Sequence, residues 1–100
     1  MIREFEASEF IAMIALQELQ KGHNSLEISI EDLVDCAKRL EKNNINIRVN
    51  LSTTSLLSFF CRTPDSISIQ KGILMFRNIE DDYIFLRRYA SEESLNRIIL

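Results

Sequence analysis

The chain has 100 residues, of which 46% are hydrophobic and 27% are charged, and its formal net charge is −3 at pH 7. This length is typical of one domain, which we place over residues 1–100. Only two glycines and one proline are present, a composition that excludes collagen-like, linker-like and low-complexity proteins. Gly22 and Gly72 alone cannot supply a glycine-rich loop that cradles phosphate groups. One histidine and two cysteines do not form a standard zinc site unless carboxylates contribute, so we expect no metal and no cofactor.

Two features predict a cytoplasmic protein that makes no membrane contact. The longest uncharged apolar run, residues 10–16, is far shorter than the ~20 residues that a membrane span needs. The acidic start of the chain lacks the basic region of a signal peptide. Cys36 and Cys61 lie among apolar neighbours within predicted helices, and we interpret both as small buried hydrophobic residues that form no disulfide.

The first predicted element is a helix over residues 6–21, with Ser8 as its N-cap and Gly22 as the residue that ends it. Its apolar side chains point in most directions around the helix axis. They are Phe10, Ile11, Ala12, Met13, Ile14, Ala15, Leu16 and Leu19.

A domain of this size is expected to cover only part of such a helix. A contiguous apolar strip left exposed favours association, and a two-fold axis lets one patch serve both copies. We therefore predict a homodimer through Phe10, Met13 and Leu16. The alternative is that the last helix of the same chain covers the strip.

The clearest local signal is the start of a second helix, predicted over residues 30–43. Ser29 and Asp32 have the spacing of a capping box, and Ile28 and Leu33 have that of a hydrophobic staple. We therefore expect Ser29 to be the N-cap.

A strand and a third helix are predicted next. Residues 45–51 alternate between apolar and polar side chains, a period typical of a half-buried strand. Ser52 is expected to cap a helix over residues 53–62, which ends before Pro64.

The last part of the chain predicts a hairpin followed by a short helix. Residues 66–77 are expected to form one strand, with a bulge or bend at Gly72, and residues 83–90 the returning strand. Ser91 is the expected N-cap of a last helix over residues 92–100.

Together these elements predict an α+β fold with about four helices and a hairpin-based antiparallel sheet, to which residues 45–51 add a third strand. The expected core consists of apolar residues from each element. It includes Ile11, Ile14, Leu33, Val34, Ala37, Leu40, Leu56, Leu57, Phe60, Ile69, Ile84 and Leu86.

Nothing in the sequence predicts catalysis. His23, the sole histidine, lies in a predicted loop without a nucleophile beside it. The paired carboxylates at residues 31–32, 80–82 and 92–93 fit helix starts or a turn, where we expect ordinary solvated charges. The run at 80–82 lacks the spacing of a calcium-binding loop.

The predicted order is a helix, a capped helix, a third helix with a hydroxyl-rich first turn, a hairpin and a last helix. This order resembles the winged helix-turn-helix family, in which the third helix enters the DNA major groove and the hairpin, or wing, touches the backbone or minor groove. The resemblance makes residues 29–43 the supporting helix, 52–62 the recognition helix and 66–90 the wing. It implies contacts with duplex DNA from Ser52, Thr53, Thr54, Ser55, Arg62, Lys71, Arg77 and Arg87.

Two functions remain open. The first is a small DNA-binding transcription regulator. It is favoured by the element order and by the stretch 48–77, which contains four cations and a single carboxylate. The second is a non-catalytic protein-interaction or dimerisation module, favoured by the acidic first half and the apolar first helix. The hydroxyls of residues 52–55 fit simple capping as well as contact with phosphates or base edges.

The distribution of surface charge discriminates between these functions. Phosphate contacts dominate affinity for DNA, so a DNA-binding face gathers its cations. If Arg48, Arg62, Lys71 and Arg77 lie on different faces, the DNA-binding hypothesis loses its support. The sequence predicts no small-molecule site.

Overall fold

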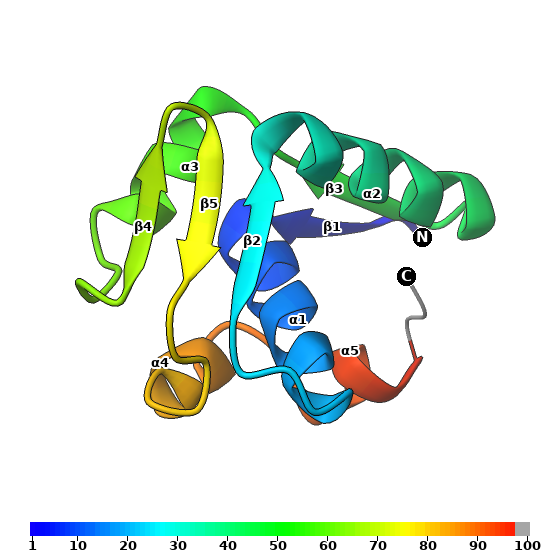
Figure 1. Cartoon of the computed structure of the whole chain (residues 1–100). Coiled ribbons are helices and arrows are strands. Elements are labelled where there is room, and N and C mark those ends of the chain that lie inside the picture. Colours follow the sequence, from blue (N-terminus) through cyan, green and yellow to red (C-terminus); the bar gives the residue numbers. More distant parts are fainter. Residues whose placement is uncertain (98–100) are drawn as a thin grey trace.

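Ten elements follow one another along residues 1–97, the part of the chain that the computed structural model describes. They form an α+β fold with a three-stranded antiparallel sheet and a two-stranded parallel sheet (Figure 1). The elements are β1 (Arg3–Glu6), α1 (Ala7–Gln20), β2 (Leu26–Ser29), α2 (Ile30–Asn43), β3 (Ile47–Asn50), α3 (Thr53–Phe60), β4 (Ile67–Gln70), β5 (Ile73–Phe76), α4 (Tyr83–Arg87) and α5 (Glu92–Arg97). The predicted last helix is thus confirmed as far as residue 97, and residues 98–100 lie outside the described part.

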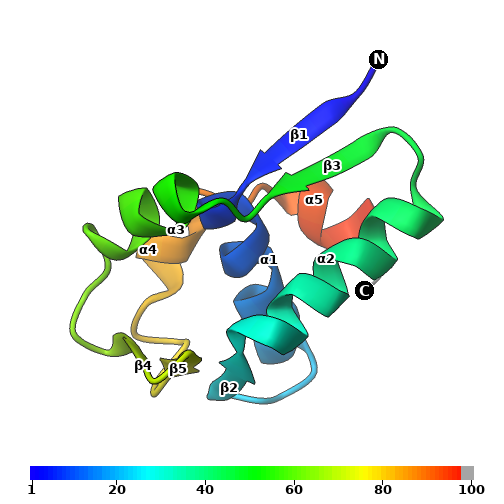
Figure 2. The same cartoon turned by 90° about the horizontal axis from the view of Figure 1, so that it is seen from above.

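Helix α1 lies at the centre of the fold, between the two sheets (Figure 2). It contacts α3, α4 and α5, so its apolar surface is covered on several sides by its own chain. Phe10 and Met13 have no exposed surface, and Leu16 keeps 2%. These three residues are therefore not accessible for the dimer interface that the sequence predicts. Cover comes from several helices and not from the last helix alone.

The first turn of α1 is capped by a residue from another helix. The predicted cap, Ser8, is wrong, because Glu6 occupies the N-cap position and its side chain makes no capping bond. Instead, the backbone N–H of Ala7 donates to Ser55 Oγ at 2.9 Å, and Ser55 Oγ donates to Glu6 Oε2 at 2.8 Å. At the other end, Gly22 has a positive φ of 89°, as expected of a residue that ends a helix.

The local signals for α2 and α3 are confirmed. Ser29 Oγ accepts from the backbone N–H of Asp32 at 3.0 Å, and α2 has the predicted bounds. Ser52 Oγ accepts from the N–H of Ser55 at 3.3 Å at the start of α3. The expected core residues of α3 are only partly confirmed: Leu56 and Phe60 pack half-buried against the core, but Leu57 is 58% exposed. The buried residues of α3 are Ser55 and Phe59.

Phe59 is the anchor of α3. Its ring lies 5.3 Å from that of Phe60, 6.0 Å from that of Phe85 and 5.8 Å from that of Tyr89, measured between ring centroids. Cys61, the C-cap residue of α3, is exposed, contrary to the expectation that it is buried, while Cys36 on α2 is half-buried. Both thiols are free.

The strand pairing differs from the prediction. Strand β3 pairs in parallel with β1, with Phe5 opposite Val49, and the third strand of the antiparallel sheet is β2, in the order β2-β5-β4. The hairpin lies wholly within the segment predicted as one strand, because Lys71 and Gly72, with φ of 53° and 74°, form a two-residue turn.

The segment predicted as the returning strand contains helix α4. Phe85 and Tyr89, like Leu86 and Ala90, are four residues apart and face inward, the spacing of a helix rather than of a strand. Ile84, expected in the core, is consequently 76% exposed.

About half of the expected core is confirmed. The buried members are Ile11, Ile14, Leu33, Ala37, Leu40 and Leu86. The half-buried members are Val34, Leu56 and Phe60, and the exposed ones are Leu57, Ile69 and Ile84.

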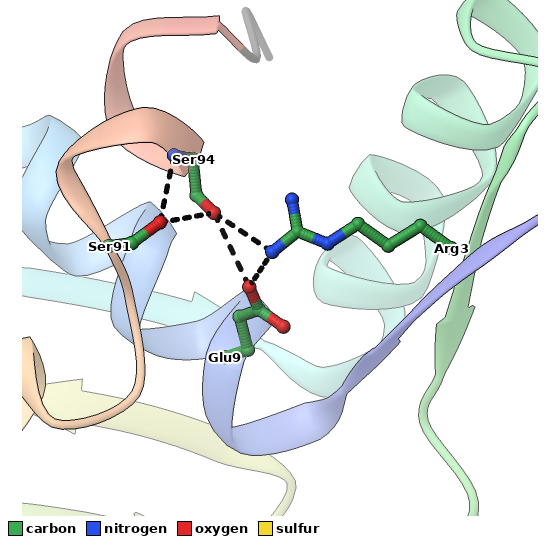
Figure 3. Close-up of polar contacts among 4 residues, drawn as sticks. All are labelled: Arg3, Glu9, Ser91 and Ser94. Carbon is green, nitrogen blue, oxygen red and sulfur yellow. Dashed lines mark hydrogen bonds and ion pairs between the residues drawn. The ribbon is translucent and has the colours of Figure 1, made fainter.

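A polar network fastens α5 to the start of the chain (Figure 3). The Arg3 guanidinium contacts Glu9 Oε2 at 2.5 Å and donates to Ser94 Oγ at 3.3 Å. Ser91 Oγ accepts from the backbone N–H of Ser94 at 3.2 Å, which confirms Ser91 as the cap of α5. Because Ser94 is 1% exposed, this network lies at the edge of the core and holds β1, α1 and α5 together.

Candidate functional site

The outer face of the three-stranded sheet is open. Ile67, Leu74 and Phe76 point into the core, whereas Ile73 and Met75 alternate with them and point outward. Both views place this sheet along one side of the molecule, and none of the helices in residues 1–97 lies on its outer side (Figures 1 and 2). Ile73, on the central strand, is therefore 38% exposed.

A shallow hollow of about 260 Å³ lies on this face. The strand register explains its composition, because Met75 lies between Ser68 of β4 and Glu27 of β2. An apolar central strand is thus flanked by polar side chains from both edge strands. The lining residues are Glu27, Ser68, Gln70, Lys71, Ile73, Met75 and Arg77. We call this set the sheet hollow.

The charges of the sheet hollow are mainly positive. Lys71 and Arg77 are exposed cations that form no ion pair with the rest of the described chain, and Glu27 is the single carboxylate in the lining. The two-residue turn holds Lys71 at one end of β5, and Arg77 directly follows the other end. The hollow therefore has the opposite sign of charge to the chain as a whole, whose net charge is −3.

The residues expected in the recognition helix are partly exposed. Ser52, Thr53 and Thr54 lie on the surface at the start of α3. Ser55, by contrast, is 8% exposed, and its hydroxyl is bonded to Ala7 and Glu6. Ser55 therefore has a structural role and cannot contact DNA in this structure.

Two of the four cations expected to contact DNA, Arg62 and Arg87, lie outside the observed hairpin and bond within the chain. Arg87 lies on α4, not on the hairpin, and its guanidinium contacts Glu92 Oε1 at 2.9 Å. Arg62 bonds to Ser58 Oγ at 2.8 Å at the end of α3, and Arg48 on β3 bonds to the backbone carbonyl of Ile47 at 3.0 Å. Of the proposed contacts, the sheet hollow brings together Lys71 and Arg77 only.

Sequence reasoning missed the other residues of the hollow. The sequence alone predicts one long strand around Gly72, so it does not define which face Ile73 and Met75 occupy. The signal that would have placed them is the pair Lys71-Gly72 between the alternating run 66–70 and the apolar run 73–76, because a two-residue break that contains glycine between two such runs is typical of a short hairpin turn.

A second, smaller hollow of about 190 Å³ lies between α1, β2 and α2. Its charged groups have partners within the chain, since Lys21 contacts Glu18 at 3.5 Å and Arg39 donates to Cys36 Sγ at 3.1 Å. Paired groups leave little to recognise a ligand, so the sheet hollow is the stronger candidate.

His23 and Asp82, which lie outside both hollows, form structural contacts. His23 Nδ1 lies 2.7 Å from Glu18 Oε2, and this bond, together with Lys21, lowers the pKa of Glu18. Asp82, expected to be a solvated charge, is 5% exposed, and Ser66 Oγ contacts its two carboxylate oxygens at 2.6 and 2.7 Å. Within residues 1–97, histidine, cysteine and carboxylate side chains form no cluster of three or more that would suit a metal.

Two further findings concern the likeness of the chain to known proteins and its helices. Comparisons with protein-family models, with curated proteins and with solved structures found no match. Among the described residues, no helix has the length and apolar character needed to cross a membrane. The surface of the chain itself is therefore the basis for any assignment of function.

Proposed function

We propose that the chain is a non-catalytic protein-interaction domain that binds a partner protein through the outer face of its three-stranded sheet. The observation that carries this proposal is the uncovered central strand. Ile73 and Met75 form an apolar centre, and Ser68, Gln70 and Glu27 surround it with polar groups. An apolar centre within a polar border is the usual arrangement of a protein interface.

A DNA-binding regulator of the winged-helix type is the second candidate. The order of three helices and a hairpin favours it, and so do Lys71 and Arg77 on that hairpin. The charge distribution argues against it, because Arg48 lies on β3, Arg62 lies in the turn after α3, and Arg87 is paired with Glu92. With few gathered cations, the attraction to phosphate groups is weak.

We also propose a cytoplasmic location. Two free thiols, of which Cys61 is exposed, suit a reducing compartment.

Site-specific photo-crosslinking in cells that express the chain tests the interaction proposal. A photoreactive phenylalanine analogue at Ile73 or Gln70 places the probe on the sheet face, and the same analogue at Asp35, exposed on α2, is the matched control. We expect crosslinks to protein from the sheet positions and none from the control position. Crosslinks to nucleic acid alone, or equal crosslinking from all positions, would overturn the proposal.

Salt-dependent binding to generic duplex DNA tests the second candidate. A DNA-binding domain must show an affinity that falls steeply as salt is raised. Absence of binding at ~50 mM salt would exclude this candidate.

A further inference from the structure

The two cations of the sheet hollow stand at opposite ends of one strand. Lys71 lies two residues before Ile73, and Arg77 lies two residues after Met75. Because Gln70 pairs with Ile73, Lys71 lies in the turn just beyond the Ile73 end of β5. The chain rises roughly 14 Å from Ile73 to Arg77, at about 3.4 Å per residue, so the backbones of the two cations are at least this far apart. Both long side chains border the hollow that lies between them. A partner that neutralises both cations therefore carries an apolar group with one anionic group on each side of it.

The turn places the backbone of one of these cations at the end of the hollow. Lys71 is a non-glycine residue with a positive φ of 53°, a conformation that lysine seldom adopts. The tight turn directs Lys71 to the tip of the hairpin, where its side chain borders the hollow. Neither Lys71 nor Arg77 has an ion pair within residues 1–97, so both charges remain for a partner.

Glu27 makes the two sides of the hollow different in charge. It lies on β2, on one side of Met75, whereas Ser68 and Gln70 on β4 are uncharged. A carboxylate repels an acidic ligand from the β2 side. An acidic ligand is therefore expected over β5 and β4, where hydroxyl and amide groups meet its backbone.

From this arrangement we infer that the sheet hollow binds an extended acidic segment of the partner protein, with carboxylates at positions i and i+4 and an apolar residue at i+2. Alternate side chains of an extended chain point to the same side, and four residues span roughly 13 Å. The two carboxylates meet Lys71 and Arg77, and the apolar side chain covers Ile73 and Met75. The inference rests on the proposed function and adds the class of partner.

The test is a fluorescence-anisotropy titration of the full chain with short labelled peptides. The probe is a serine- and threonine-based nonapeptide that carries glutamate, isoleucine and glutamate at i, i+2 and i+4. The matched controls are the same peptide with lysines in place of the glutamates and a peptide of scrambled order. We expect binding of the first peptide alone, with an affinity that falls several-fold between about 50 and 300 mM salt because exposed charges are screened.

Variants of the chain locate the binding. Lys71→Asn removes the charge but keeps a residue that tolerates a positive φ, and Arg77→Gln removes the second cation. Each is expected to weaken binding at least fivefold, and Glu27→Gln to strengthen it. Lys38→Glu and Lys42→Glu, on the exposed side of α2, are the controls and are expected to leave the affinity unchanged. Circular dichroism establishes that each variant is folded.

The outcomes separate this inference from the proposed function. Equal binding of the acidic and lysine peptides, or no effect of Lys71→Asn and Arg77→Gln, overturns the inference. If the acidic peptide does not bind but photo-crosslinks from Ile73 to protein persist, the partner class is wrong and the interaction function stands. Competition between duplex DNA and the acidic peptide at Lys71 and Arg77 also overturns it, because the hollow is then a phosphate site.

Discussion

Ser55→Ala is expected to destabilise the fold by about 2–3 kcal/mol. The hydroxyl accepts from the N–H of Ala7 and donates to the Glu6 carboxylate, so one small group serves two partners. A hydrogen bond to a charged group contributes about 1.5–3 kcal/mol, and a buried N–H left without a partner costs about 1–3 kcal/mol. The two effects share one atom and overlap, so the expected loss of about 2–3 kcal/mol is well below the sum of the two. For a domain of this size the expected fall in melting temperature is roughly 10–20 °C.

Urea unfolding followed by circular dichroism measures this loss. The matched control is Ser58→Ala on the same helix, where the hydroxyl is exposed and accepts a hydrogen bond from the Arg62 side chain. We expect a loss of less than about 0.5 kcal/mol for the control. A double-mutant cycle with Glu6→Gln should give a coupling energy of about 1 kcal/mol between the two side chains. If Ser55→Ala and Ser58→Ala have the same midpoint, the capping of α1 by Ser55 is refuted.

Three further changes test other parts of the fold. Ser29→Ala should lower the free energy of unfolding by about 1 kcal/mol through loss of the α2 cap, and an unchanged urea midpoint would show that Ser29 does not cap. Phe59→Ala should cost about 3–5 kcal/mol because it empties a fully buried site among aromatic rings, and a loss below 1 kcal/mol would contradict that packing. The lowered pKa of Glu18 means that its bond to His23 stabilises the fold above about pH 4.5 and is lost as pH falls through the folded-state pKa. In His23→Ala, carboxyl NMR titration should therefore show a higher pKa for Glu18, and an unchanged pKa would refute the assignment.

The elements predicted correctly are those whose causes lie within a few residues. Ser29 and Ser52 cap α2 and α3, and Ser91 caps α5, because each hydroxyl bonds to the backbone three residues on. Gly22 ends α1 for a similarly local reason. Such signals are complete in the sequence itself, since no distant residue takes part in them.

The errors arise where a distant partner decides the structure. The acceptor for the first N–H of α1 is Ser55, 48 residues away, so no reading of the helix start alone would find it. Strand β3 has the alternation of a strand, but its parallel pairing with β1 depends on how the chain folds back. The short apolar run in α4 fits a strand or a helix equally well, and the ring of Phe59 decides between them.

Part of the candidate site can be predicted from the sequence. The sequence predicts that Lys71 and Arg77 lie on a hairpin, and the structure places both beside the same hollow. Ile73, Met75 and Glu27 were not assigned, because their outward direction depends on a register that the turn at Gly72 sets.

The network of Arg3, Glu9 and Ser94 holds β1 and α5 on the same side of the molecule. Arg3 and Ser94 are 91 residues apart in sequence, yet their side chains are hydrogen-bonded. Strand β1 and helix α5 lie together on the side of α1 that faces away from β2, β5 and β4 (Figure 2). A label, a surface anchor or a neighbouring domain that is linked through β1 or α5 therefore lies on the opposite side of the molecule from the sheet hollow.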